Sequence, residues 1–129
     1  MLTLMPATPL MPAVPALDVR IMRTGDELME GLSKVLRYVP GNDAGPQRLA
    51  DELGVDTVLA SRLLKAVRSP DSMSLIHRAP GPEPLRRVLK ASAKHGVPPD
   101  VLAAAHQAVD AFENLIDSAA GDRSSLEAI

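Results

Sequence analysis

Two short segments with helical spacing of their apolar residues, 46–53 and 57–67, lie three residues apart near the middle of the chain. Pro46 suits the first turn of a helix, where the missing N–H has no partner to lose, and Gly54 is typical of a helix end. Asp56 can cap the start of the second segment with its carboxylate. A helix-turn-helix needs two helices that cross steeply around such a short turn, and this arrangement would constrain the rest of the fold.

The residue types that a steep crossing needs are present at matching offsets. Ala50 offers a small side chain where the helices would come closest, and Gly54 can adopt the left-handed backbone conformation that the turn requires. The apolar residues that would line the inner faces are Leu49, Leu53, Val55, Ala60, Leu63 and Leu64. The combination predicts a helix-turn-helix. A plain helical hairpin is the alternative, because single residues of these types also occur in such hairpins.

The segment LADELGVDTVLASRLLKAV, residues 49–67, resembles the second and third helices of bacterial winged helix-turn-helix transcription regulators of the MarR and IclR type. The resemblance is close over this segment and looser over 24–81. It implies a three-helix core followed by a β-hairpin wing. The sequence departs from the pattern at Val58 and Leu59, where such regulators often carry Ser or Thr, so that only apolar contacts are offered there. Residues 69–81 are short and rich in proline, which predicts a reduced or absent wing.

One side of the predicted helix at 57–67 is polar and cationic. In the major groove an arginine can bond both acceptors of guanine, whereas lysine and serine more often hold phosphates. We expect Thr57, Ser61 and Arg62 to contact base edges or their surroundings. We expect Lys65 and Arg68 to contact the DNA backbone. With two phosphate-binding candidates on the preceding helix, the predicted DNA-binding residues are Gln47, Arg48, Thr57, Ser61, Arg62, Lys65 and Arg68. An ordinary solvated helix face is the alternative.

The rest of the chain is also rich in helix formers. No Trp, one Tyr and one Phe occur, so the core must be built from Leu, Val, Ile, Ala and Met. Apolar spacing predicts further helices, which span 24–39, 83–95 and 99–119. Thr24 and Glu27 form a capping-box pattern at the start of the first, and 72–77 has weak strand character. The predicted fold class is all-α, or α with a minimal β wing, with two helices after the helix-turn-helix core.

The chain of 129 residues suits one compact domain with flanking segments. Four prolines near its start interrupt any helix or strand, which predicts a disordered arm. We divide the chain into this Pro- and Met-rich arm at 1–20, a DNA-binding domain at 21–81, a C-terminal helical pair at 82–120, and a tail, or the start of a further segment, at 121–129.

Charge is segregated along the chain although the net charge is only −2. Residues 40–95 carry nine Lys or Arg against six Asp or Glu, whereas 96–129 carry one Arg against six acidic residues. The positive excess therefore surrounds the candidate DNA-binding segment. A further basic edge consists of Arg86, Arg87, Lys90 and Lys94. This edge either extends the phosphate-binding surface or is a solvated helix face.

The predicted helix at 99–119 carries an apolar seam with alternating spacings of 3 and 4. Its residues are Leu102, Ala105, Val109, Phe112, Ile116 and Ala119. Such a seam is typical of coiled coils, and helix-turn-helix regulators commonly bind two half-sites as dimers. We therefore expect a homodimer through this helix. Packing of the helix on its own domain is the alternative.

Several function classes are excluded by missing residues or motifs. There is no Cys, and the histidines at 77, 95 and 106 are far apart, so we expect no metal site. No phosphate loop, nucleophile motif or paired-carboxylate pattern occurs, so we expect neither an enzyme nor a cofactor. The apolar start lacks the charged, unbroken form of a signal peptide, and no stretch approaches the ~20 apolar residues of a membrane span. These features predict a soluble, cytoplasmic protein.

The functional hypothesis is a sequence-specific DNA-binding transcription regulator, or the DNA-binding domain of one, that places 57–67 in the major groove. The alternative is a winged-helix-like protein-interaction module that does not bind DNA. The net negative charge and the apolar pair Val58 and Leu59 favour that alternative. A small-molecule-sensing domain has only the methionine content in its favour.

Overall fold

The computed structural model describes residues 17–41 and 43–128, and within them every regular element is a helix. The elements are α1 (Leu17–Leu36), α2 (Pro46–Leu53), α3 (Thr57–Val67), α4 (Ser72–Arg78), α5 (Pro82–Ser92), the 3-10 helix η1 (Ala93–His95) and α6 (Pro99–Ala128). The prediction of an all-α chain is therefore confirmed.

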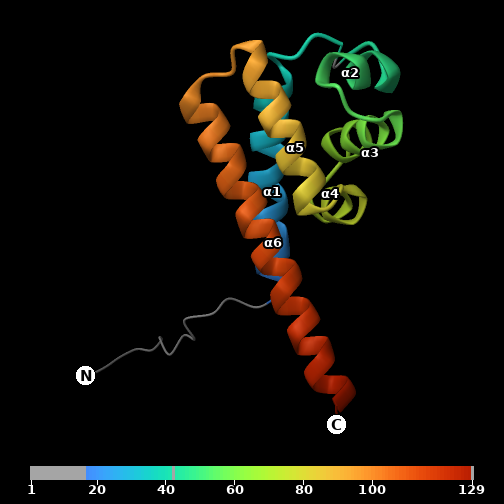
Figure 1. Cartoon of the computed structure of the whole chain (residues 1–129). Helices are drawn as coiled ribbons and strands as arrows, with labels where there is room; N and C mark the ends of the chain where they lie inside the picture. The colour runs from blue at the N-terminus through green and yellow to red at the C-terminus, as the bar shows by residue number, and fades with distance from the viewer. Residues whose placement is uncertain (1–16, 42, 129) are drawn as a thin grey trace, which may run out of the picture.

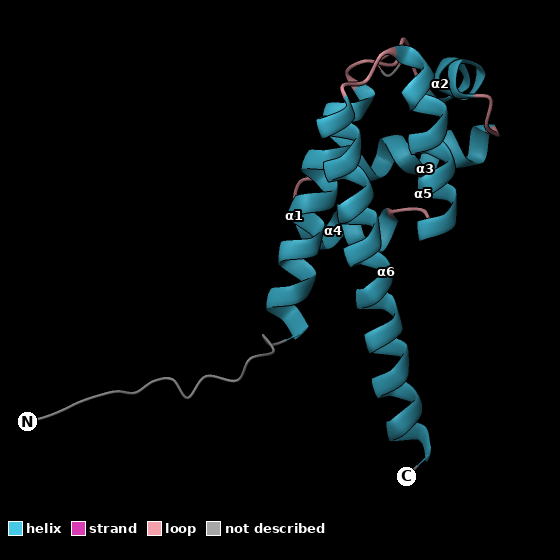
Figure 2. Cartoon of the chain, turned by 60° about the vertical axis from the view of Figure 1, so that its left-hand side comes forward, coloured by secondary structure: helices cyan, strands magenta, loops and turns pink. Residues whose placement is uncertain are grey.

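The helices form two layers that share one core. The long helices α1 and α6 run antiparallel side by side (Figures 1 and 2). Helices α2, α3 and α4 lie together, to the right of α1 in Figure 1. α4 packs on both α1 and α3, and α5 packs chiefly on α6. A single cluster of buried apolar side chains runs through all of these contacts, from Leu32 of α1 and Leu63 of α3 to Leu89 of α5 and Val109 of α6.

The apolar seam of α6 is largely buried against the chain's own helices. Ala105, Val109 and Phe112 belong to the core, while Ile116 remains 41% exposed. A Cβ added at Gly31 of α1 would lie 3.1 Å from the Cα of Ala105, so the small residues allow the two helices a close approach. The alternative to a dimer seam, packing of the helix on its own domain, therefore accounts for this part of the seam.

Helix α1 begins at Leu17, earlier than the predicted start at Thr24. Residues 17–20 of the predicted arm are thus helical, and the remainder of that arm lies outside the described residues. Thr24 is a buried residue in the middle of the helix, so its pairing with Glu27 is not a capping box. The pattern was misleading because this turn packs against α4, a contact that local sequence does not reveal.

The contact between α1 and α4 is close and polar at its edge. A Cβ added at Gly25 would lie 2.6 Å from the carbonyl oxygen of Ser72. The Ser72 hydroxyl donates a hydrogen bond to the carboxylate of Asp26. The absence of a side chain at Gly25 therefore leaves the space that α4 needs on the surface of α1.

The predicted weak strand at 72–77 is wrong, because this segment forms α4. The Asp71 carboxylate accepts a hydrogen bond of 2.8 Å from the Ser74 N–H and so caps the helix. This backbone hydrogen bond is the main cause that lowers the pKa of Asp71 below its ordinary value of 3.8. Leu75 is fully buried in the core. Over 69–81 the structure has a short helix in place of the two strands of a wing.

The remaining bounds agree with the prediction to different degrees. The predicted helix at 83–95 is divided into α5 and η1, and the predicted helix at 99–119 continues as α6 to Ala128. Most of the predicted tail at 121–129 is therefore helical.

Candidate nucleic-acid interface

The connection between α2 and α3 has the local structure that the sequence predicts. Gly54 ends α2 with φ 67° and ψ 34°, in the left-handed region, and the Val55 N–H donates to the Ala50 carbonyl over 3.1 Å. The Asp56 carboxylate accepts the Leu59 N–H at 2.7 Å and caps α3. A Cβ at Gly54 would meet nothing within 4 Å, so glycine is favoured there by backbone conformation and not by space.

The apolar side of α3 is buried in the core. Ala60 and Leu63 are fully buried, Leu64 is buried, and Val67 is half-buried. Leu59 is also buried, which corrects the expectation that it offers an apolar contact at the surface. This side of α3 therefore holds the helix in place and cannot contact a ligand.

The polar side of α3 faces outward, as predicted. Thr57, Arg62, Lys65 and Arg68 are exposed and Ser61 is half-buried. Among the described residues, Val58 is the most exposed large apolar side chain, at 65% of its full exposure. This outward face combines polar, cationic and apolar groups on a helix of 11 residues.

A hollow of about 310 Å³ lies beside this face, next to the start of α2. Ser61 and Lys65 of α3 line it, together with Arg68, which directly follows α3, and Arg78 from the last turn of α4. An Nη of Arg78 donates to the Ser69 hydroxyl over 3.4 Å, and that hydroxyl donates to the Lys65 carbonyl over 2.9 Å. Three cationic side chains thus converge on one concave surface. Arg78 is not among the seven predicted DNA-binding residues, because it reaches this place only when 72–78 is helical.

The two candidates on α2 are exposed but differ in charge environment. The Arg48 Nε lies 3.3 Å from an Oε of Glu52, one turn further along the same helix, so its charge is partly compensated. Gln47 is exposed at the start of the helix. Both can reach a ligand that lies along α2, and Arg48 would have to exchange its ion pair to do so.

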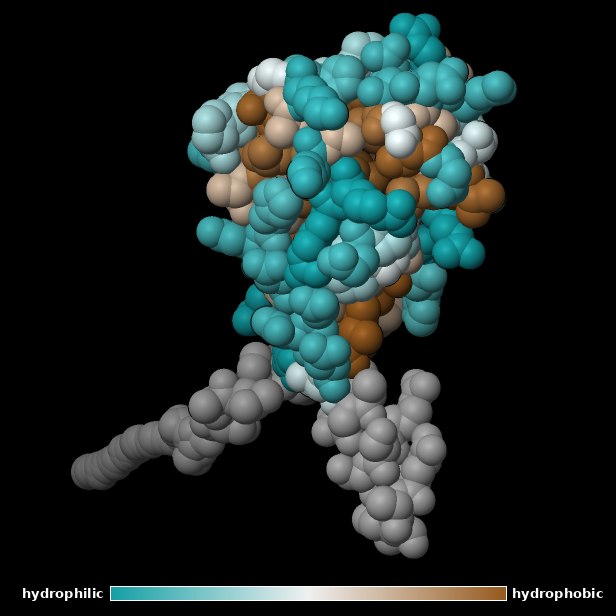
Figure 3. Space-filling view, in the orientation of Figure 1, coloured by the Kyte–Doolittle hydropathy of each residue, from teal (hydrophilic) through white to brown (hydrophobic). Residues whose placement is uncertain are grey.

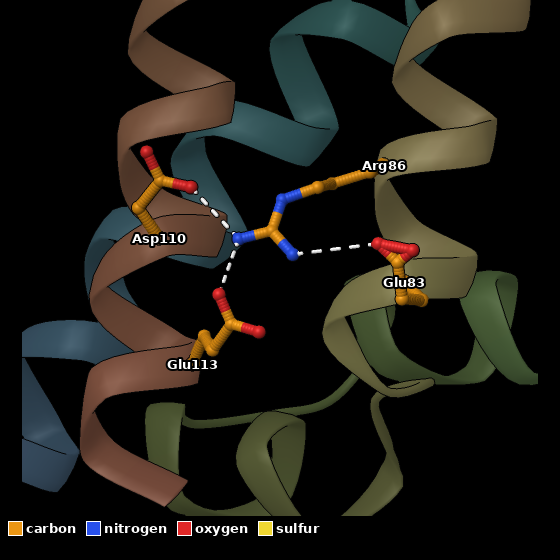
Figure 4. Close-up of polar contacts among 4 residues, drawn as sticks. All are labelled: Glu83, Arg86, Asp110 and Glu113. Atoms are coloured by element: carbon orange, nitrogen blue, oxygen red, sulfur yellow. Dashed lines mark hydrogen bonds and ion pairs between the residues drawn. The ribbon is translucent and has the colours of Figure 1, made fainter. Parts of the chain in front are cut away.

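The basic edge of α5 is not uniform. Arg86 points to α6, where one Nη donates to Asp110 and to Glu113, each at 2.8 Å, and the other lies 3.8 Å from Glu83 (Figure 4). Glu113 and then Asp110 are the largest causes that raise the pKa of the Arg86 guanidinium above its ordinary value. Arg86 therefore joins α5 to α6 and is unavailable to a ligand.

Arg87, Lys90 and Lys94 differ from Arg86 because they are exposed and form no ion pair with any described residue. Within the described part of the chain, no group of three or more His, Asp or Glu residues is placed to hold a metal ion. None of the described helices is both long and apolar enough to cross a membrane. Comparison with protein-family models, with curated proteins and with solved structures finds no match to this chain.

Proposed function

We propose that α2 and α3 form a helix-turn-helix and that the chain is a sequence-specific DNA-binding transcription regulator, or the DNA-binding domain of one. The observation that carries the proposal is the division of α3 into two sides. Its apolar side is buried in the core, while Arg62 and Lys65 stand on the exposed side, and the helix begins three residues after the left-handed Gly54. A helix held in this way can enter the major groove of DNA without disturbing the fold.

The outward face offers each kind of contact that a major groove accepts. Arg62 can bond the two acceptors of guanine, and Val58 can contact a thymine methyl group. Thr57 and Ser61 supply hydroxyls to bases or phosphates. The concave surface beside Lys65 has the charge and shape to hold a backbone phosphate. In this arrangement Arg78 contacts the DNA backbone from α4.

The test is binding of the full chain to duplex DNA as a function of salt. A protein that neutralises several phosphates loses affinity steeply as salt rises, because counterions are released on binding. We expect Arg62→Ala and Lys65→Ala to weaken binding to a duplex selected from genomic fragments by about 1–3 kcal/mol for each specific contact. Lys34→Ala is the matched control, because Lys34 is an exposed cation of α1 that pairs with Glu30 at 3.7 Å.

Two results would overturn the proposal. One is an affinity for duplex DNA that does not depend on salt. The other is an equal effect of the control and of the α3 substitutions, with all variants equally stable to heat.

The second candidate function is a protein-interaction module with the same helical core. The exposed Val58 and the net charge of −2 favour it, because both suit a protein surface better than a polyanion. Such a module would not bind duplex DNA even at low salt, and Val58→Asp would abolish capture of its protein partner.

A homodimer in the cytoplasm remains part of the proposal, through a part of α6 that the core leaves open. Ile116 is exposed there, and Arg20 of α1 donates to the Ser118 hydroxyl over 3.2 Å, which places the start of α1 alongside. Leu17 and Met22 of α1 are also exposed apolar residues. We expect light scattering to give a dimer mass for the full chain and a monomer mass for Ile116→Glu.

A further inference from the structure

Three of the four Lys and Arg residues on α5 and η1 form a surface of their own. Arg87, Lys90 and Lys94 are spaced by three and four residues, which places them on one side of the helical segment α5–η1. All three are exposed, whereas Arg86 is turned to α6. Figure 3 is drawn in the orientation of Figure 1 and shows hydrophilic side chains along the front of the molecule, where α5 lies. We call Arg87, Lys90 and Lys94 the α5 cationic edge.

The α5 cationic edge borders the connection between α2 and α3. Arg87 and both lysines line a hollow of about 230 Å³ whose opposite wall includes Gly54 and Val55. Arg87 also lines a second hollow of about 180 Å³, together with Arg62 and Val58 of α3. Positive charge therefore extends without a break from the outward face of α3 to the end of α5.

Little negative charge opposes this surface. Asp56 is the one carboxylate that lines either hollow, and it accepts the Leu59 N–H as the cap of α3. The cations have no ion-pair partner among the described residues, so their charge is available to an anionic ligand.

The position of the edge relative to α3 is set by packing and by a hydrogen bond. Val88 and Leu89 of α5 are fully buried. At the end of the segment, the Nε2 of His95 lies 3.1 Å from the carbonyl oxygen of Glu52 in α2. The edge is thus attached to the same rigid body as the outward face of α3.

We infer that the α5 cationic edge binds the phosphate backbone of one DNA strand while α3 occupies the major groove. A helix in that groove has a phosphate backbone on each side of it. Lys65 and Arg78 stand on one side of α3, and the α5 cationic edge stands on the other, next to Arg62. The inference rests on the proposed function and extends it to a surface outside the α2–α3 pair.

The experiment uses a fluorescein-labelled duplex of random sequence, because phosphate contacts do not depend on sequence. Anisotropy gives the affinity of the full chain over a series of salt concentrations. The test variant is Lys90→Ala with Lys94→Ala. The control is Arg23→Ala with Lys34→Ala, which removes the same charge from exposed positions on α1. A charge-conserving variant, Lys90→Arg with Lys94→Arg, should bind as the unmodified chain does.

We expect the test variant to bind more weakly and to reduce the slope of log affinity against log salt by about 0.9 for each lost phosphate contact. The control should leave that slope unchanged. The inference is overturned if the test variant behaves as the control does while Arg62→Ala and Lys65→Ala still weaken binding. If neither the unmodified chain nor any variant binds the duplex, the proposed function and the inference fail together.

Discussion

The side of the molecule formed by α1 and α6 differs in charge from the side formed by α3 and α5. A hollow of about 450 Å³ between α1 and α6 is lined by Glu27, Glu30 and Asp100, with Lys34 as its one cation. The four hollows beside α3 and α5 are lined by cations, and the two carboxylates that line them are Asp43 and Asp56. The near-neutral net charge therefore conceals two surfaces of opposite sign, and the electrostatic fit to a ligand depends on which surface it meets.

The largest effect that can sharpen this comparison is a loss of stability that both sides share. Leu63 of α3 is fully buried in the same core as Val109 of α6. We expect Leu63→Ala to lower the free energy of unfolding by about 2–5 kcal/mol, measured by urea titration and circular dichroism. The control Val58→Ala, at an exposed position, should change it by less than about 0.5 kcal/mol. Amide hydrogens of α6 that keep full protection in Leu63→Ala would show that the two sides unfold separately.

A smaller loss of stability is expected where α1 contacts α4. Gly25→Ala places a methyl group 2.6 Å from the carbonyl oxygen of Ser72, and backbone cannot rotate away as a side chain can. We expect a cost of about 1–3 kcal/mol, seen as a lower urea midpoint. An alanine normally stabilises a helix relative to glycine, so an unchanged or higher midpoint would contradict the close contact between these helices.

The two neighbouring arginines of α5 should differ in their effect on thermal stability. Arg86→Met removes the ion pairs with Asp110 and Glu113 and should lower the melting temperature modestly, because the group is partly exposed. The decrease should shrink as salt rises and screens the ion pairs of the unmodified chain. Arg87→Met should leave the melting temperature unchanged. Equal melting temperatures of the two variants at low salt would remove the distinction between a structural and an available cation.

The smallest effect is expected on the acidic side. Glu27→Gln with Glu30→Gln removes two negative charges from the hollow between α1 and α6. If DNA binds on the α3 and α5 side, this change leaves the salt dependence of duplex binding as it is and raises the affinity only slightly. The salt slope of this glutamine variant could instead increase by as much as the slope falls in Lys90→Ala with Lys94→Ala. That result would indicate that DNA binds on the side formed by α1 and α6.

The parts of the fold that could be predicted from sequence have strong local signals. α2 and α3 have the predicted bounds because Pro46, Gly54 and Asp56 mark their ends through backbone geometry and capping. Segment 72–77 was predicted wrongly because Ser, Met and Ile do not favour one structure. The burial of Leu75 between α1 and α3 stabilises the helix there. The cap at Asp71 was a local signal that could have revealed it.

For the candidate site too, local sequence predicts some features and misses those that depend on distant residues. The outward direction of Arg62 and Lys65 follows from helical spacing once the apolar side of α3 is known. The difference between Arg86 and Arg87 does not follow, because it depends on carboxylates of α6 that lie more than twenty positions away along the chain, such as Asp110. Arg78 and the neighbouring Lys65 are likewise brought together only by the packing of α4 on α3.

If α3 binds the major groove as proposed, the hydrogen bond between His95 and the Glu52 carbonyl affects which kind of duplex fits the protein. It attaches the far end of the helical segment α5–η1 to α2. The distance between α3 and the α5 cationic edge is therefore fixed. The wide major groove of B-form DNA admits a helix, whereas the major groove of A-form RNA is deep and narrow. This fixed distance should therefore favour binding to double-stranded DNA over double-stranded RNA of the same sequence and charge.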